Sequence, residues 1–161
     1  GPSTEELYLR WTELGAFTPF MCTHDGNARE DNHRWDSDPA TTEHFARFSR
    51  VHDALAPELR VLAAEAALTG APIVRALFLE YPEDLATWEL SDQYLLGPDL
   101  LVAPMLHEGE TEREVYLPDG TWFNVWTGEA LEGPGSFTVE GPIGSPPVFA
   151  RGADRSDLRS L

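Results

Sequence analysis

Apolar residues in the first part of the chain recur at a helical period. A first helix is predicted from Ser3 to Gly15, with Ser3 and Glu6 at the spacing of a capping box. One face of this helix is apolar, because its large hydrophobic residues stand four and three positions apart. These residues are Leu7, Trp11 and Leu14.

A second, longer helix is predicted beyond a polar stretch. The run from Phe17 to Cys22 is mostly apolar and predicts a short strand, whereas Thr23 to Asp38 has no period and predicts a loop. Asp38-Pro39 then supplies an N-cap followed by proline at the first helical position, Pro57 predicts a kink, and Gly70 ends the helix. The positions on its predicted buried face are Phe45, Phe48, His52, Leu55, Leu59, Leu62 and Ala66.

After Gly70 the pattern changes to short apolar runs bounded by proline, glycine and aspartate, which predict antiparallel strands. Pro118-Asp119-Gly120 predicts a turn between two of them, because proline presets φ and glycine accepts a positive φ. We expect a small β-sandwich, with Arg151 to Leu161 as a frayed or helical tail. The predicted strands are Ile73 to Tyr81, Tyr94 to Gly97, Leu100 to Pro104, Arg113 to Leu117, Thr121 to Trp126, Ser136 to Glu140 and Pro147 to Ala150.

The segment from Ser3 to Gly70 is too small to form a closed α/β domain. Two helices and one strand leave apolar faces that need a partner surface. We therefore expect this segment to be the end of a larger unit, whose remaining part covers the helices.

Composition narrows the range of partners. The 161 residues include 28 acidic and 11 basic ones, which gives a formal net charge of −17. So negative a surface repels phosphate backbones and anionic lipid, and neither nucleic acid nor a membrane is expected as a partner. A single cysteine, Cys22, cannot form an internal disulfide, and no signal-like segment opens the chain. These features favour the cytoplasm.

The loop after the predicted strand holds the candidate chemistry. It contains Thr23-His24-Asp25-Gly26-Asn27, where a β/α barrel would place its functional loops. His24 can exchange hydrogen bonds with a sugar hydroxyl, and the other interpretation is a histidine that caps a helix or bridges backbone groups. Cys22 is expected to be a small packed residue rather than a nucleophile, because no basic neighbour stands beside it to stabilise a thiolate.

No metal site is predicted. Asp36-Ser37-Asp38 resembles the start of a calcium loop, but the central glycine and the terminal glutamate do not follow at the required spacing. N-capping by Asp38 is the interpretation that we adopt.

Seven segments, in order along nearly the whole chain, resemble the family 31 glycoside hydrolases, a group of retaining α-glycosidases. The resemblance implies a fold of class α/β plus all-β. Residues 1–70 would form the last helices and strand of a (β/α)8 barrel, and residues 71–161 a C-terminal antiparallel β-sandwich. The segments are Glu6 to Trp11, Gly15 to His24, Ala64 to Pro72, Leu77 to Asp84, Asp92 to Gly97, Leu100 to Pro104 and Val115 to Trp122.

Finer features resemble the sulfoquinovosidase-type members, which release sulfoquinovose, a 6-sulfonated glucose. Ordinary α-glucosidases share most of the motifs, so both substrate classes are left open. Cys22 stands where the family has an arginine, in the motif Met-Arg-x-His, which changes the local charge and packing. The segments that carry this finer resemblance are Thr23 to Asn27, Asp31-Asn32, Trp35 to Asp38 and Gly141 to Phe149.

The resemblance also implies where the active-site residues lie. The two catalytic aspartates of the family stand on barrel strands upstream of these residues, so no catalytic residue is assigned here and the chain alone is expected to be inactive. His24 matches the family histidine that hydrogen-bonds the sugar in the −1 subsite. No cofactor is implied. The implied partners are a small-molecule α-glycoside and the missing N-terminal part of the same enzyme, and a homo-oligomer is left open.

A second hypothesis is a non-catalytic carbohydrate-binding or scaffold β-sandwich module. Its test is the exposure of the aromatic residues, because exposed, coplanar Trp122 and Trp126 would stack on sugar rings. We expect the aromatic residues of this half to be core or interface residues instead. They are Trp88, Trp122, Phe123 and Trp126.

Overall fold

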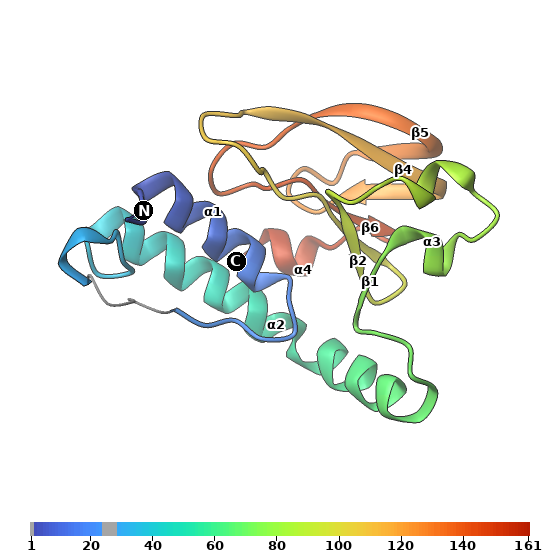
Figure 1. Cartoon of the computed structure of the whole chain (residues 1–161), viewed down its shortest axis with the longest axis horizontal. Coiled ribbons are helices and arrows are strands. Elements are labelled where there is room, and N and C mark those ends of the chain that lie inside the picture. Colours follow the sequence, from blue (N-terminus) through green and yellow to red (C-terminus); the bar gives the residue numbers. More distant parts are fainter. Residues whose placement is uncertain (1, 24–28) are drawn as a thin grey trace.

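The computed structural model describes residues 2–23 and 29–161. Two helices, α1 and α2, lie side by side next to a curled antiparallel sheet (Figure 1). Hydrogen bonds join six strands into one sheet in the order β1-β2-β3-β6-β4-β5. The change from helices to strands near residue 70 is as the sequence pattern predicts.

The N-cap of helix α1 (Glu5–Ala16) lies one residue later than predicted. Its N-cap is Thr4, whose hydroxyl accepts the backbone N–H of Leu7 at 3.3 Å. Ser3 is drawn away from the capping position, because its own N–H donates to the Asn32 side chain at 2.7 Å. The predicted apolar face is also not the face that packs inward, since Leu7 is 55% exposed and Trp11 is 62% exposed. The residues of α1 that are buried are Leu9, Thr12, Glu13 and Ala16.

Helix α2 (Pro39–Thr69) has the predicted boundaries. The Asp38 carboxylate accepts the backbone N–H of Thr41 at 2.9 Å, and Pro39 occupies the first turn. Gly70 ends the helix in the left-handed conformation, with a φ of 80°, and its N–H donates to the Ala66 carbonyl. Pro57 lies inside α2 without ending it. The buried apolar side chains of α2 are Phe48, Val51 and Leu55.

The predicted strand from Phe17 to Cys22 is wrong for this chain. The segment follows α1 through a short turn and forms no strand ladder with the described residues. A strand needs a neighbouring strand to receive its backbone hydrogen bonds, and a barrel strand takes those neighbours from the rest of the barrel.

The antiparallel strands predicted after Gly70 are confirmed, with changes in length. Strand β4 pairs on one side with β5 and on the other with β6, so the last strand in the sequence lies inside the sheet. The strands are β1 (Val74–Arg75), β2 (Tyr94–Leu96), β3 (Leu100–Val102), β4 (Glu112–Asn124), β5 (Ala130–Glu140) and β6 (Val148–Arg151). The predicted tail contains a short helix, α4 (Ser156–Arg159).

The strand predicted from Ile73 to Tyr81 is wrong beyond its first residues. Strand β1 is an edge strand with only two residues paired to β2, and the helical turn α3 (Leu77–Glu80) follows. Leu77 is fully buried, so the chain bends to place this side chain in the core instead of extending the edge. The 3₁₀ helix η2 (Leu85–Trp88) completes the connection to β2.

The sheet separates two hydrophobic clusters. Because side chains alternate along a strand, Leu95, Leu101 and Phe149 point into one cluster, and their neighbours on β2, β3 and β6 point into the other. On one side the cluster includes Phe48, Val51 and Leu55 of α2. On the other it includes Val115 and Leu117 of β4, so the long β4–β5 hairpin folds back over the middle strands. The layers expected of a sandwich thus come from one curled sheet.

The turn predicted at Pro118-Asp119-Gly120 is wrong, because β4 runs through these residues. The register with β5 shifts between Leu117 and Gly120, which makes an irregularity of the bulge type in place of a reversal. Gly133 lies opposite Gly120, and a Cβ atom on it would stand 2.0 Å from the Pro118 carbonyl oxygen. The glycine therefore permits the close approach of the two strands.

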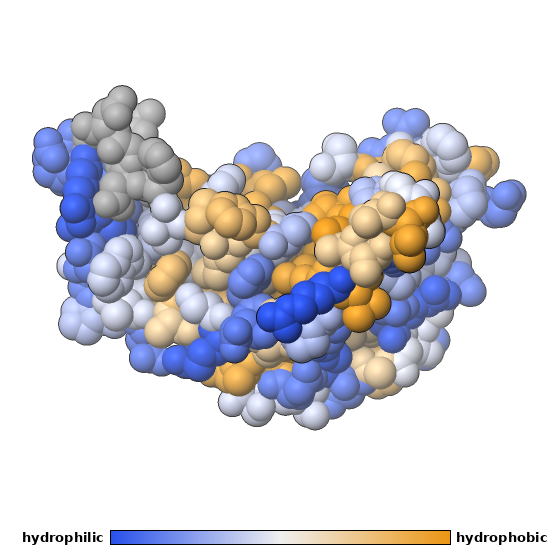
Figure 2. All heavy atoms as spheres, turned by 90° about the horizontal axis from the view of Figure 1, so that it is seen from below, coloured by the Kyte–Doolittle hydropathy of each residue, from blue (hydrophilic) through white to orange (hydrophobic). Residues whose placement is uncertain are grey.

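Several large apolar side chains remain on the surface. Val61 of α2 is 69% exposed and Leu68 is 86% exposed, and Figure 2 shows apolar side chains gathered in patches on the underside of the molecule. Patches of this kind are typical of surfaces that another structure covers. Among residues 2–23 and 29–161, no helix combines the length and the apolar character that crossing a membrane requires.

We expect Gly133→Ala to lower the free energy of unfolding by about 2 kcal/mol or more, because the added methyl overlaps the Pro118 carbonyl. Gly135→Ala is the matched control, since its Cβ would meet the Phe137 ring at 3.6 Å, an ordinary contact. Urea unfolding of both variants measures the difference. Equal stabilities would show that the strands can separate at the bulge without cost.

Candidate functional site

The candidate site is the stretch that leads from the end of α1 toward the loop with His24. Residues 24–28 lie outside the described residues, so the structure does not test the predicted sugar contact of His24. The residues just before this loop are described up to Thr23, and those after it from Arg29. The structure therefore describes the residues that hold the chain on either side of this loop, and we call these residues the supports of the site.

Three side-chain donors, from the turn after α1, from α2 and from β2, satisfy the carbonyl groups at the end of α1. Helix ends leave carbonyls without partners inside the helix. The Thr18 hydroxyl donates to the Gly15 carbonyl at 2.8 Å, and the His52 ring nitrogen Nδ1 of α2 lies 3.1 Å from the Ala16 carbonyl. The Tyr94 hydroxyl of β2 donates to the Phe17 carbonyl at 3.0 Å. The chain thus leaves α1 along a fixed path.

Side-chain packing holds the same stretch. Phe17 is fully buried and meets the Trp126 ring edge-on, with 6.1 Å between ring centroids. Met21 packs against the same cluster, whereas Phe20 is 78% exposed. Cys22 is also exposed, so the prediction that it is packed is wrong. Met21, the residue next to it, takes the inward position.

The residues after the loop build the cap of α2. Carboxylate or imidazole atoms of Glu5, His33 and Asp38 lie within 4.8 Å of one another. Both Asp38 oxygens accept hydrogen bonds from Thr41, and His33 Nε2 lies 2.7 Å from the Thr41 hydroxyl. The Thr41 N–H and hydroxyl hold the pKa of Asp38 below its usual value. N-capping by Asp38 is confirmed, and these groups serve the helix end.

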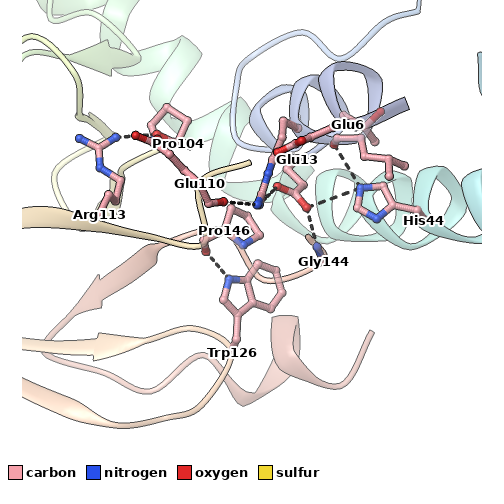
Figure 3. Close-up of polar contacts among 12 residues, drawn as sticks. Glu6, Glu13, His44, Pro104, Glu110, Arg113, Trp126, Gly144 and Pro146 are labelled. Atoms are coloured by element: carbon pink, nitrogen blue, oxygen red, sulfur yellow. Dashed lines mark hydrogen bonds and ion pairs between the residues drawn. The ribbon is translucent and has the colours of Figure 1, made fainter. Parts of the chain in front are cut away.

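A buried carboxylate joins α1 to the loop before β6. Glu13 is 2% exposed, and its Oε1 accepts the Gly144 N–H at 2.5 Å while Arg10 donates to its Oε2 at 3.1 Å (Figure 3). Arg47 of α2 donates to the carbonyl of the same glycine at 2.5 Å. Burial raises the pKa of Glu13, and the Gly144 N–H and Arg10 oppose that rise. Both helices therefore hold the backbone of Gly144, α1 through its N–H and α2 through its carbonyl.

His44 packs beside this carboxylate without forming a strong ion pair. Its Nε2 lies 3.2 Å from the Leu9 carbonyl and 3.7 Å from the Glu13 carboxylate. Burial lowers the pKa of His44, which favours the neutral ring with its proton on Nε2. The ring thus donates to Leu9, and Arg10 is the nearer positive partner of Glu13.

The aromatic residues of the second half are mostly structural, as predicted. Trp122 is fully buried, and its indole N–H donates to the Pro118 carbonyl at 2.8 Å. Trp126 is half-buried, and its N–H donates to the Pro146 carbonyl at 2.5 Å. Trp88 is 54% exposed and stacks on Phe78 with 5.0 Å between centroids. The pair required for a sugar platform, Trp122 with Trp126, is therefore not exposed.

A groove of about 490 Å³ lies away from this site, between the second half of α2 and the ends of the middle strands. Two of its carboxylates, Glu58 and Glu65, are ion-paired at 3.0 Å with Arg155 and Arg75. These ion pairs fix α2 against residues 71–161, which we call the sheet domain. The lining residues are Glu58, Val61, Leu62, Glu65, Leu96, Pro98, Asp99, Leu100, Ala150, Arg151, Ala153 and Arg155.

The supports of the candidate site do not follow from the local sequence pattern. The pattern places His52 only on the apolar face of the second helix and Tyr94 only in a strand. A polar atom on a residue of an otherwise apolar face was the available signal, because such an atom needs a partner when it is buried. The partners themselves are 36 and 77 positions away along the chain, and no local pattern identifies them.

Two family models match the chain in succession. The glycosyl hydrolases family 31 TIM-barrel domain matches residues 1–60, and the glycosyl hydrolase family 31 C-terminal domain matches residues 70–154. A sulfoquinovosidase of Agrobacterium fabrum is 49% identical over 97% of the chain, and one of Escherichia coli is 49% identical over 92%. Alpha-glucosidase 2 of Bacillus thermoamyloliquefaciens is 36% identical over 91%.

Solved structures agree with these relatives. A GH31 family sulfoquinovosidase from E. rectale, in complex with the aza-sugar inhibitor IFGSQ, superposes with a TM-score of 0.93 and 38% identity over 99% of the chain. The chain covers 24% of that structure, and 24% and 22% of the two curated sulfoquinovosidases. It therefore spans about a quarter of the length of these relatives.

We expect Glu13→Gln to remove a pH-dependent loss of stability. Because the pKa of Glu13 is raised, the folded chain holds this proton more strongly than the unfolded chain. The stability that the Glu13 proton contributes to the folded chain is fully present below the usual pKa of 4.5. It is lost as the pH rises through the raised pKa. Urea unfolding at about pH 5 and about pH 7.5 should show that the unmodified chain loses more stability than the variant on this rise.

The lowered pKa of His44 acts in the opposite direction, because the unfolded chain then binds its proton more readily as the pH falls. The comparison is therefore between the two chains at each pH. Glu140→Gln, at an exposed position on β5, is the control for the loss of one charge. A difference between Glu13→Gln and the unmodified chain that does not change with pH would contradict the prediction.

Proposed function

The chain belongs to glycoside hydrolase family 31, and from this premise we propose that it is the C-terminal part of a retaining α-glycoside hydrolase. The observation that carries the proposal is the succession of barrel and C-terminal family models along one chain that is 49% identical to sulfoquinovosidases. The rest of the enzyme, about three quarters by the length of these relatives, would supply the remaining barrel.

The two parts of the chain have different roles in this proposal. Residues 1–70 complete the barrel, and residues 71–161 form the domain that supports its end. The exposed apolar residues Leu7 and Trp11 of α1 and Val61 and Leu68 of α2 support this division, because another part of the enzyme would bury them.

The bond cleavage itself is assigned to the missing part. A retaining glycosidase needs a nucleophile and a general acid/base, with carboxyl groups about 5 Å apart. By family resemblance both aspartates lie upstream, so the chain alone is inactive. No cofactor takes part in such a reaction, since two carboxyl groups and water suffice.

His24 is the substrate-binding residue that we assign to this chain. By family resemblance its imidazole exchanges hydrogen bonds with hydroxyl groups of the sugar in the −1 subsite. A bond that strengthens as charge develops on the ring would lower the barrier as well as hold the substrate. The supports of the preceding stretch favour this role, because they fix the path of the chain as far as Met21.

The preferred substrate class is an α-sulfoquinovoside. The higher identity to sulfoquinovosidases than to Alpha-glucosidase 2, 49% against 36%, favours it. By family resemblance, the groups that bind the sulfonate belong to the missing part, upstream of this chain. The unpaired, exposed Cys22 favours a reducing compartment, and we place the enzyme in the cytoplasm.

A non-catalytic sugar-binding module is the weaker proposal. It needs an aromatic platform, and the burial of Trp122 together with the packing of Trp126 removes the pair that was expected to form one. It also leaves the match of residues 1–60 to a barrel domain without a purpose.

We expect the whole enzyme to hydrolyse an aryl α-sulfoquinovoside with a kcat/KM at least about a hundredfold above that for the aryl α-glucoside, because a site built for a charged group rejects an analogue that lacks it. Release of the aryl group measures both rates, and the isolated chain serves as the inactive control. Preference for the glucoside would make the enzyme an α-glucosidase. Turnover by the isolated chain would place the catalytic carboxylates within it.

His24→Ala in the whole enzyme should lower kcat/KM by about tenfold to a hundredfold, the size expected for one hydrogen bond to a group that carries charge in the transition state. His107→Ala is the matched control, because His107 is an exposed histidine between β3 and β4 that lies beside the first turns of α1, not in the stretch that leads to His24. An unchanged kcat/KM in His24→Ala, measured with the preferred substrate, would remove His24 from the site.

A further inference from the structure

The stretch before His24 is held by contacts to two separate parts of the chain. His52, on α2, lies against the Ala16 carbonyl, and Tyr94, on β2, donates to the Phe17 carbonyl. Helix α2 belongs to the barrel part proposed above, whereas β2 belongs to the sheet domain. Through Tyr94, the sheet domain thus makes a hydrogen bond to the backbone of the stretch that leads to the substrate-binding loop.

The contact is well defined. The Tyr94 ring packs in the cluster that also contains Phe17 and Met21, so the hydroxyl is brought to the carbonyl by a side chain with little freedom. The Phe17 carbonyl lies just beyond α1, where a backbone acceptor needs a partner from outside the helix. Burial raises the pKa of the Tyr94 hydroxyl well above its usual value, so the group remains a donor at every pH where the enzyme would work.

The distance along the chain makes the contact relevant to binding. Phe17 precedes His24 by seven positions and Met21 precedes it by three. The contacts of Phe17 and Met21 with the core fix two points of the backbone close to the loop. Because each residue spans at most about 3.6 Å, these two points limit where the backbone can enter the loop. A small displacement of a binding group is costly in catalysis, because the hydrogen bonds of the transition state depend on its position.

We propose that Tyr94 is a positioning residue for the substrate-binding loop, through which the sheet domain sets the entry of the chain into the active site. The proposal rests on the proposed function, because it requires that the loop contacts substrate. It gives the sheet domain a part in catalysis besides its packing against the helices.

The test compares two hydroxyl deletions in the whole enzyme. Tyr94→Phe keeps the ring and removes the hydrogen bond to Phe17. Tyr116→Phe is the matched control, because its hydroxyl donates to Asp84 at 2.6 Å on the opposite side of the sheet. We expect Tyr94→Phe to lower kcat/KM by about three- to tenfold at equal folded fraction, with Tyr116→Phe unchanged.

Two further measurements separate positioning from stability. Amide hydrogen exchange in the peptides that cover residues 16–28 should rise in Tyr94→Phe and not in Tyr116→Phe. In the His24→Ala background, Tyr94→Phe should have little further effect on kcat/KM, because the two changes then act on one contact.

Each outcome decides the proposal. Equal kcat/KM for the two tyrosine variants, unchanged exchange in residues 16–28, or additive effects of Tyr94→Phe and His24→Ala would overturn it. If the whole enzyme hydrolyses no α-glycoside, the proposed function fails instead. Hydrogen exchange alone then decides whether Tyr94 holds the stretch.

Discussion

The structure depends on burying both faces of its three middle strands. Strands β2, β3 and β6 are short and strongly apolar, and their side chains alternate between two clusters. Neither face can be left to water, so one is covered by α2 and the other by the β4–β5 hairpin, which folds back over it. The helices and the hairpin therefore take their positions from the same strands. A change in the packing of one cluster displaces these strands and so alters the packing of the other cluster.

Polar groups within this apolar frame fix its details. Glu13 accepts the Gly144 N–H, Arg47 donates to the Gly144 carbonyl, and Tyr94 donates to the Phe17 carbonyl. Each pairs a backbone group that regular structure leaves without a partner, and an unpaired group of this kind is costly when buried. Apolar packing thus chooses which elements meet, whereas these bonds choose how they are aligned.

The sequence predicts the features that are determined locally. The ends of α2 follow from Asp38, Pro39 and Gly70, which act within a few residues of their positions. The errors arise where distant residues decide. The run after Phe17 has a strand composition without strand neighbours, and Pro118-Asp119-Gly120 has the composition of a turn but lies opposite Gly133, which allows β4 to continue. In the candidate site, only His24 is predictable, because the family motif contains it. The residues that support the stretch before His24 make long-range contacts, which no local pattern indicates.

The place of β6 in the sheet has a consequence for the order of folding. Although it is the last strand in the sequence, it lies between β3 and β4 and joins the two halves of the sheet. A ribosome that has released everything before Val148 presents the early strands and the β4–β5 hairpin as separate pieces. The sheet becomes continuous only when the final strand inserts, so the topology imposes a late, non-local step of the kind that slows folding. A premature stop codon just before Val148 would then remove four strand residues and, with them, the connection on which both layers depend.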